Sequence, residues 1–382
     1  MVKIGTWNPD KVTLTDDSVP DSFKYCVLQG VYGPDSGNDY NGSLGARISS
    51  VFVILFVSTA FTMFPLVAKR IKALKIPLYV YLFARYFGTG VIVATAYVHL
   101  MDPAYAEIGG NSCVGMTGNW AIYAWPPALM LLSIFSTFLV DMVSQAYVER
   151  KFGILHSHAD QNSIEDAIII EKSQHQDLLG NTLEKDLEND VPKLNKENKS
   201  PDADVEDYNS VAETDAEYDF SYQFSAFLIL ELGVIFHSVM IGLNLGAVGD
   251  EFKTLYIVLV FHQSFEGLGI GARLSAIPIP DTKPKWLPWV CCLVYGLVTP
   301  ICVAIGLGVR TAYNSNSYAA NVVLGVLDSL SAGVLMYTGL IELIARDFIF
   351  NPSASHDLYR LTFLIFCMLL GAGIMALLGK WA

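Results

Sequence analysis

The chain has 382 residues, of which 53% are hydrophobic and 16% are charged, and its formal net charge is −13. The apolar residues are gathered in windows of about twenty or more, which is the pattern of membrane spans and excludes an ordinary soluble domain. The sequence has no basic stripe with interleaved aromatic residues, which argues against nucleic-acid binding. The composition therefore predicts an all-α integral membrane protein that lies in a lipid bilayer.

Eight segments are apolar and long enough to cross a bilayer as helices, which predicts an eight-transmembrane-helix bundle. The expected spans are residues 47–67, 77–101, 122–145, 222–248, 254–274, 284–308, 320–344 and 359–380. They divide the chain into an N-terminal tail at 1–46, helices one to three at 47–149, a hydrophilic loop at 150–221, and helices four to eight at 222–382. The connections between the spans then indicate which side of the membrane each part faces.

The basic residues of these connections alternate between the two sides of the membrane. Lys69 and Arg70 follow the first span, and Arg150 and Lys151 follow the third. The connection at 102–121 contains no Lys or Arg. Because cytoplasmic connections are enriched in Lys and Arg, this alternation predicts that both termini are extracytoplasmic and that the long loop is cytosolic.

Two cysteines fall on the predicted outer side. Cys26 lies in the tail and Cys113 lies in the connection between the second and third spans, while the other four cysteines fall inside predicted spans. Since that side is oxidising, a Cys26–Cys113 disulfide is one alternative. Two free thiols are the other alternative, because distance along the chain does not show whether the geometry allows a bond.

The loop at 150–221 has a different composition from the rest of the chain. Residues 159–219 contain 18 Asp and Glu and 5 Lys, so this segment alone accounts for the net charge. Few aromatic residues and no sustained apolar period predict disorder. The loop histidines either bind metal weakly after its release or are solvated side chains, and the loop lysines are candidate targets for regulatory machinery. These histidines are His156, His158 and His175.

Two histidines and a glutamate are predicted at the middle of the membrane on neighbouring helices. His237 lies near the midpoint of the span at 222–248, and His262 and Glu266 straddle the midpoint of the span at 254–274. An ionisable side chain at this depth costs about 2.5–3.5 kcal/mol on insertion scales and is usually functional. Each could be a hydrogen-bonded packing residue, but imidazole and carboxylate are also ligands of divalent metal ions. The matched depth of the three favours a metal site.

Both of these helices carry glycines at four-residue spacing. The glycines are Gly242 and Gly246 on the first helix and Gly267 and Gly271 on the second. Such spacing lets helix backbones approach closely. We therefore expect the two helices to pack against each other through their glycines, as a shared metal site would require.

Other polar residues in or near the spans are candidates for steps of a path across the membrane. These candidate pathway residues are His99, Asp102, Glu231, Asn244, Asp328 and Glu342. His99 and Asp102 are expected at the outer rim of the second span, where His99 is either a ligand or an interfacial anchor. Each of the others is either a pathway residue or one member of a structural pair.

The segments Glu-Leu-Gly-Val-Ile-Phe-His-Ser-Val-Met-Ile-Gly at 231–242 and Phe-His-Gln-Ser-Phe-Glu-Gly at 261–267 resemble the two signature helices of the ZIP family of zinc and iron uptake transporters. The resemblance covers all eight spans and is closest to the fungal plasma-membrane zinc transporters. It implies uptake of a divalent metal ion into the cytosol, with Zn²⁺ as the expected substrate and Fe²⁺ or a broader range of divalent metals as the alternative. It also implies a multi-pass protein of the plasma membrane, with an internal membrane as the alternative.

The resemblance further implies how the site is divided. His237, His262 and Glu266 line a first metal position, while Ser238 and Gln263 flank a second one beside Glu266. Because Ser238 and Gln263 are neutral, we expect one metal ion or a transient second one. The metal is expected to be transported substrate, with no resident cofactor, and a homodimer is a candidate assembly.

Two other classes of protein use similar residues. A metal-sensing receptor would bind the ion through the same ligands without flux, and only a transport assay separates it from a transporter. An intramembrane metalloenzyme would need an arrangement such as His-Glu-x-x-His. This chain has His-x-x-x-Glu at 262–266, with no second histidine after it in that helix, so we expect no enzyme activity.

Overall fold

The computed structural model describes residues 8–9, 12–32, 42–71, 77–152, 201–249, 251–310, 317–349 and 358–381. Every regular element in these ranges is a helix, with η3 and η5 π-helical and η4 a 3₁₀-helix. Eight helical segments of the described residues are long and apolar enough to cross a membrane, which confirms the predicted all-α membrane protein with eight spans. In chain order the elements are α1 (Asp21–Leu28), α2 (Leu44–Arg70), α3 (Leu78–Ala94), η3 (Thr95–Met101), α4 (Asp102–Ile108), η4 (Gly118–Ile122), α5 (Trp125–Phe152), α7 (Pro201–Ala247), α8 (Phe252–Ala276), α9 (Leu287–Val309), α10 (Tyr318–Tyr337), η5 (Thr338–Ile349) and α11 (Leu358–Leu378).

Each predicted span coincides with one observed span, and most ends differ by a few residues. The observed spans are Leu44–Arg70, Leu78–Ile108, Trp125–Phe152, Ala216–Ala247, Phe252–Ala276, Leu287–Val309, Tyr318–Ile349 and Leu358–Leu378. The second span continues to Ile108 because the π-helical segment η3 runs directly into α4. Polar residues end the apolar pattern there without ending the helix. The side of the membrane that each end faces stays a prediction.

The hydrophilic segment between the third and fourth spans is shorter than the predicted loop at 150–221. α5 continues to Phe152, and α7 (Pro201–Ala247) carries the fourth span from Ala216, so helices extend into both ends of the predicted loop. Proline is favoured at the first position of a helix, and acidic residues in the following turn favour its N-terminus. The loop histidines lie outside the described residues: His156, His158 and His175.

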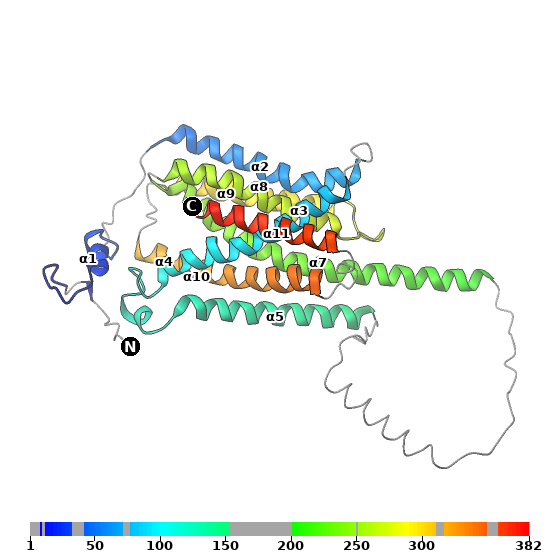
Figure 1. Ribbon diagram of the computed structural model, residues 1–382, viewed down its shortest axis with the longest axis horizontal. Helices are drawn as coiled ribbons and strands as arrows, with labels where there is room; N and C mark the ends of the chain where they lie inside the picture. The colour runs from blue at the N-terminus through cyan, green and yellow to red at the C-terminus, as the bar shows by residue number, and fades with distance from the viewer. Residues whose placement is uncertain are drawn as a thin grey trace, which may run out of the picture. The chain divides into compact units, whose positions relative to one another are not determined.

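The chain divides into two compact units. The smaller unit, residues 145–219, contains the end of α5 and the first part of α7. In the larger unit, α2 packs along α8 and α9, α3 packs along α8 and α11, and α10 packs along α4 and η3 (Figure 1). The backbones of α3 and α8 meet at Gly88 and Gly269, where a side chain on either residue would collide with the other.

The glycines predicted to join α7 and α8 face other helices. Gly242 and Gly246 of α7 lie against the backbone of α9, whereas Gly267 and Gly271 of α8 lie against α2. The predicted contact between α7 and α8 through these glycines is therefore wrong. Small residues on one face of a helix show that another backbone can approach that face closely, but they do not show which helix does so. The glycines thus let α9 lie close to α7, which carries His237, and let α2 lie close to α8, which carries His262.

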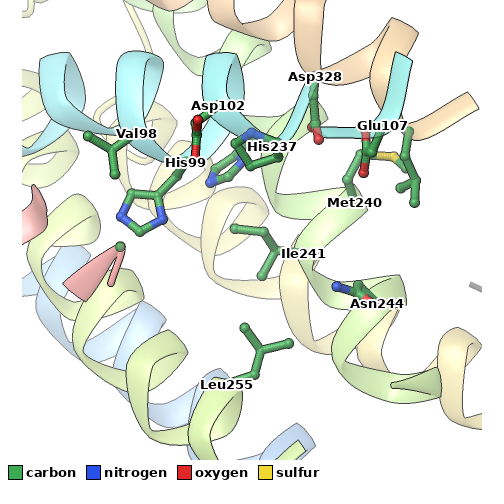
Figure 2. Close-up of a pocket in the computed structure, with 13 residues that line it drawn as sticks. Val98, His99, Asp102, Glu107, His237, Met240, Ile241, Asn244, Leu255 and Asp328 are labelled. Carbon is green, nitrogen blue, oxygen red and sulfur yellow. The ribbon is translucent and has the colours of Figure 1, made fainter. Parts of the chain in front are cut away.

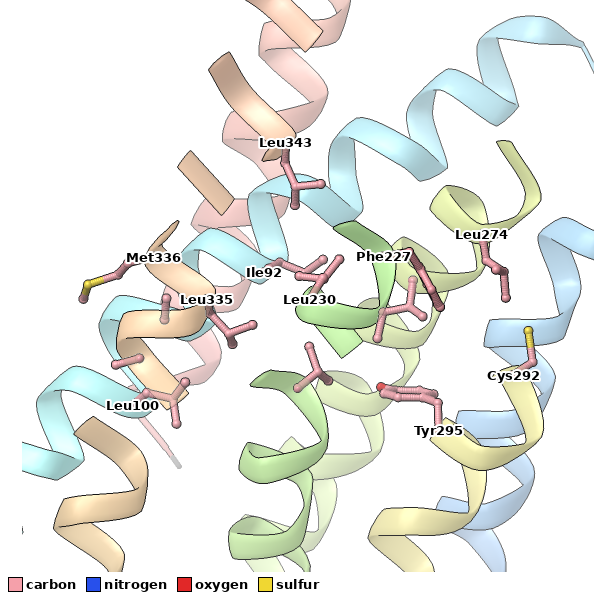
Figure 3. Packing of buried hydrophobic residues seen from close by; sticks show 14 of the residues in the cluster. Ile92, Leu100, Phe227, Leu230, Leu274, Cys292, Tyr295, Leu335, Met336 and Leu343 are labelled. Atoms are coloured by element: carbon pink, nitrogen blue, oxygen red, sulfur yellow. The ribbon is translucent and has the colours of Figure 1, made fainter. Parts of the chain in front are cut away.

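Buried apolar side chains from several helices form the largest core cluster of the described residues (Figure 3). It includes Ile92 of α3, Phe227 of α7, Leu274 of α8, Tyr295 of α9 and Leu335 of α10. α2, α5 and α11 contribute less, because only 28%, 22% and 22% of their apolar windows are buried. Their exposed apolar faces suit contact with lipid, as expected for a protein whose solvent is the bilayer.

Arg47 is a fully buried charged side chain in the first turn of α2. Its guanidinium donates hydrogen bonds to the carbonyl oxygens of Gly246 (3.2 Å) and Val248 (2.5 Å) at the end of α7. It also lies 4.4 Å from the centroid of the Phe252 ring. The last carbonyls of a helix have no partner within the helix and carry the negative end of its dipole, so a buried cation is stabilised there. Arg47 thus ties the end of α7 to α2.

Candidate metal transport site

His237 of α7 and His262 of α8 meet in the interior of the bundle. Their Nε2 atoms lie 3.3 Å apart, and each residue is 1% exposed. Two ligands bound to one tetrahedral Zn²⁺ at about 2.0–2.1 Å stand about 3.3 Å apart. The two histidines that the sequence places at one depth therefore have their Nε2 atoms at the spacing that a zinc ion requires.

Glu266 adds a carboxylate to this histidine pair. Its Oε2 atom lies 3.6 Å from His262 Nε2, one helical turn away, and the residue is completely buried. Its other carboxylate oxygen, Oε1, is buried and has no hydrogen-bond partner in the structure. A buried charged oxygen without a partner is costly, and a bound cation would remove that cost.

His99 belongs to the same cluster and not to the outer rim, where the sequence analysis expected it. Its ring centroid lies 5.0 Å from that of His262, and its Nε2 atom lies 3.2 Å from the carbonyl oxygen of Met375. His99 lies deeper than expected because the second span continues nine residues beyond it, to Ile108. His99 also lies in the π-helical segment η3, a type of helix often found at functional sites.

A cavity of about 180 Å³ reaches this cluster from the end of the bundle where α4 lies and α10 begins, which we call the outer end after the predicted topology. His99 and His237 line its inner part (Figure 2). Its other polar lining comes from Asn244 of α7 and from carboxylates of α4 and α10. These carboxylates are Asp102, Glu107 and Asp328.

Among the described residues, no Lys or Arg lines this cavity, and its ionisable groups there are carboxylates and imidazoles. Glu107 and Asp328 are close enough to interact electrostatically, although α4 and α10 lie far apart in the sequence. Sequence reasoning missed Glu107, because it fell in the connection beyond the predicted end of the second span. Carboxylate and imidazole are the kinds of group that bind divalent cations, so the lining of this cavity suits their entry.

The two neutral residues assigned to a second metal position differ in their surroundings. Ser238 is fully buried, and its Oγ has no hydrogen-bond partner in the structure. Gln263 Oε1, in contrast, lies 3.2–3.3 Å from hydroxyl groups of α2 and α9. These hydroxyls belong to Ser58, Tyr295 and Thr299, none of which the sequence analysis singled out.

Known proteins resemble this chain over nearly its whole length. The family model described as ZIP zinc transporter matches residues 44–379. The chain belongs to the ZIP family. It is 60% identical to zinc-regulated transporter 1 of Saccharomyces cerevisiae over 98% of this chain and 97% of that protein. It is 37% identical to zinc-regulated transporter 1 of Schizosaccharomyces pombe (90% and 88% covered) and 27% identical to Fe(2+) transport protein 1 of Arabidopsis thaliana (89% and 86% covered).

Membership of the ZIP family makes this chain a membrane transporter of metal ions and not an enzyme. Within the described ranges, no three His, Cys, Asp or Glu side chains converge as a complete metal site. The donor atoms of this ZIP transporter instead form pairs, His237 with His262 and His262 with Glu266, each at ligand spacing.

The inner end of the transporter carries a different polar arrangement, in which acidic residues are paired with arginines. Arg85 Nη2 lies 2.8 and 2.9 Å from the two carboxylate oxygens of Asp347, and Arg346 Nη1 lies 2.7 Å from Glu342 Oε2. Arg273 of α8 donates a hydrogen bond to the carbonyl oxygen of Glu342 (3.1 Å). Glu342 is therefore one member of a structural pair in this structure, the second of the two alternatives that the sequence left open.

Glu231 lies between the central cluster and this inner end. It is buried on α7, and its Oε1 has no hydrogen-bond partner in the structure. It interacts electrostatically with Tyr295 and with Cys291, both of α9. A buried carboxylate with one oxygen free of hydrogen bonds suits a step in a cation path.

At the outer end, a disulfide joins Cys26 of α1 to Cys113 in the connection after α4. The tail is also held by hydrogen bonds, from Tyr32 OH to the carbonyl oxygen of Cys113 (2.6 Å) and from the backbone N–H of Tyr318 to the carbonyl oxygen of Val31 (3.1 Å). The tail is thus fastened both to the connection that follows α4 and to the start of α10, next to the two helices that carry the cavity carboxylates.

Proposed function

We propose that this chain takes up Zn²⁺ into the cytosol and that His237, His262 and Glu266 bind the ion at the middle of the membrane, with His99 as a further ligand. The observation that carries the proposal is the pair of imidazole nitrogens 3.3 Å apart, buried where an acidic cavity ends. Nitrogen and oxygen donors without Cys or Met suit Zn²⁺ or Fe²⁺ better than Cu⁺. The relatives named zinc-regulated transporters support zinc as the substrate.

The path that we propose begins in the outer cavity. Its carboxylates raise the local concentration of divalent cations, and Asp102 and Asn244 meet the hydrated ion first. The ion exchanges water for imidazole and carboxylate at the central cluster, where Ser238 Oγ is a further oxygen without a partner. Glu231 then receives it on the inner side, and the pair between Glu342 and Arg346 separates to release it.

We also propose that the protein lies in the plasma membrane with both termini outside and the segment between α5 and α7 in the cytosol. The alternation of basic residues between connections supports this orientation. A homodimer and regulatory machinery acting on the cytosolic segment stay predictions from the sequence. The relative named for Fe(2+) transport is the reason to test iron beside zinc.

Uptake of zinc-65 into cells that express the chain tests this proposal, with iron-55 in parallel. We expect saturable zinc uptake that falls to background in a Glu266→Ala variant, because the variant removes the carboxylate of the central site. Asp281→Ala is the control, since that exposed carboxylate lies outside the bundle interior and pairs only with Lys285 in the described residues. Surface level is measured for each variant.

Absence of uptake of either metal, with the chain present at the cell surface, would contradict transport and favour the metal-sensing receptor. Iron uptake that exceeds zinc uptake at equal concentrations would contradict zinc as the main substrate. Zinc uptake that persists in Glu266→Ala at the wild-type rate would remove Glu266 from the site.

A further inference from the structure

A group of hydroxyls surrounds Gln263 and Glu266 on the side of α2 and α9. Ser58 Oγ and Thr299 Oγ1 each lie 3.3 Å from Gln263 Oε1. Tyr295 OH lies 3.2 Å from that oxygen and 3.3 Å from Glu266 Oε2. Ser58, Gln263, Glu266, Tyr295 and Thr299 are all completely buried.

The protons of this group can be assigned by counting donors and acceptors. The amide oxygen of Gln263 has two lone pairs, and the hydroxyls of Ser58 and Thr299 supply one proton each. These two donors satisfy the amide oxygen. The single proton of Tyr295 is then free for Glu266 Oε2, an ionisable acceptor that binds a donor more strongly than a neutral amide does.

This assignment gives Gln263 and Tyr295 different roles. The oxygen of Gln263 is occupied by hydroxyl donors, and its amide Nε2, which has no partner in the structure, is a donor that cannot bind a cation. Tyr295 holds one oxygen of Glu266, while the other oxygen, Oε1, is left without a partner. Glu266 is therefore fixed on one side and free on the other.

We infer that Tyr295 is a positioning residue that holds Glu266 in place for the transported ion, and that Gln263 is a neutral anchor for this network and not a metal ligand. The central site then has one carboxylate and accepts one divalent ion at a time. The inference rests on the proposed zinc transport. The helix packing supports it, because Gly267 of α8 lies directly against Ser58, Thr62 and Tyr295, so the network has no room to rearrange.

The direct test is Tyr295→Phe, which removes the hydroxyl and keeps the ring. We expect the KM for zinc uptake to rise roughly tenfold, the effect of losing one hydrogen bond to a charged group. We expect Vmax per surface transporter to stay within about twofold of wild type, since no ligand is lost. A merely structural defect would lower the surface level and Vmax and leave KM unchanged.

Tyr337→Phe is the matched control. Tyr337 is also buried, and its hydroxyl also donates to a carboxylate, Asp141 Oδ2, at 2.8 Å, but neither residue touches the central cluster. We expect this variant to leave KM unchanged. An equal rise in KM in both variants, or an unchanged KM in Tyr295→Phe at normal surface level, would overturn the role of Tyr295.

Two further measurements keep the inference testable if Tyr295→Phe fails to reach the surface. Thr299→Val removes one donor to Gln263, so the proton of Tyr295 is drawn away from Glu266 and KM is expected to rise by about two- to threefold. An unchanged KM overturns the network. The zinc content of the purified full chain, compared with Glu266→Ala, is expected to differ by one ion per chain; a difference of two overturns the single-ion site.

These outcomes separate the inference from the proposed function. A wild-type chain without zinc uptake contradicts zinc transport itself. A wild-type chain that transports zinc, beside a Tyr295→Phe variant with the same KM, contradicts only the role of Tyr295.

Discussion

The outer cavity and the inner end of the bundle contain the same kinds of acidic residue in opposite circumstances. Asp328 and Glu107 line a cavity that has no Lys or Arg among its described lining residues, whereas Asp347 and Glu342 form ion pairs with arginines. A carboxylate without a partner favours a cation from solution, while a paired carboxylate already has its counter-charge: the Asp347 pair joins η5 to α3, and the Glu342 pair lies within η5. The comparison shows that the function of an acidic residue here depends on whether the protein has already supplied its counter-charge.

The largest expected effect on zinc uptake lies at the central cluster, between the outer cavity and the inner end. His262→Ala removes the imidazole that both donor pairs share, so zinc uptake should fall to background at normal surface level. His99→Ala removes a ring that lies beside His262 and reaches the carbonyl oxygen of Met375, and it should raise KM while uptake persists. Zinc-65 uptake at several concentrations distinguishes the two. Equal loss in both variants would contradict the central place given to His262.

The second prediction concerns the unpaired carboxylates. Glu107→Gln combined with Asp328→Asn should raise the KM for zinc roughly tenfold and leave Vmax unchanged, because capture weakens and the central ligands stay intact. The effect should shrink as ionic strength rises, since salt screens the attraction. Glu251→Gln, an exposed carboxylate in the turn before α8, is the control. Insensitivity of the double variant to salt would exclude an electrostatic role.

The third prediction concerns the paired carboxylates. Asp347→Asn leaves Arg85 without its counter-charge and should lower the free energy of unfolding by about 1–3 kcal/mol, less than for a fully buried pair because Arg85 keeps 27% of its side chain exposed. KM for zinc should not change. Thermal unfolding of the purified protein measures the first effect and uptake the second.

The double variant Arg85→Gln with Asp347→Asn checks the cause of that effect. It removes both charges, and it should restore most of the lost stability if the cost comes from an unpaired arginine. A change in KM with intact stability would show instead that the inner ion pair takes part in transport.

The smallest expected effect on uptake lies at the disulfide. Cys26→Ser with Cys113→Ser should leave KM within about twofold of wild type, because neither residue lines the cavity. The same variant should make the N-terminal tail sensitive to external protease, since the bond closes a separation of 87 residues and restricts the tail. Cys291→Ser, which removes a free thiol of α9, is the control.

The sequence placed His237 and His262 at one level of neighbouring helices, and in the structure their side chains meet. The reason is geometric. Rise per residue in a helix is fixed, so the distance of His237 and His262 from the ends of their spans determines their level in the membrane. The same reasoning placed His99 at the rim, because an end chosen by hydropathy missed the continuation through η3 and α4. Depth is therefore only as reliable as the span end from which it is counted.

The sequence did not predict which helices contact each other side by side. Which neighbour a helix face meets depends on rotation about the helix axis and on tertiary packing, which explains the wrong assignment of Gly267 and Gly242. The ion pair between Arg85 and Asp347 joins residues 262 positions apart, and nothing in either local pattern predicts it. Tyr295 resembled any apolar residue of α9, because its role depends on the single hydroxyl that reaches Glu266.

The disulfide of the tail also makes the orientation of the protein measurable. A bond between Cys26 and Cys113 forms in an oxidising compartment and not in the cytosol, so its formation records which side of the membrane the tail has reached. A closed loop of this size shortens the denatured chain, and the oxidised form should migrate faster on a non-reducing gel. The ratio of the oxidised band to the reduced band then reports the fraction of molecules whose tail has reached the oxidising side, without any added tag.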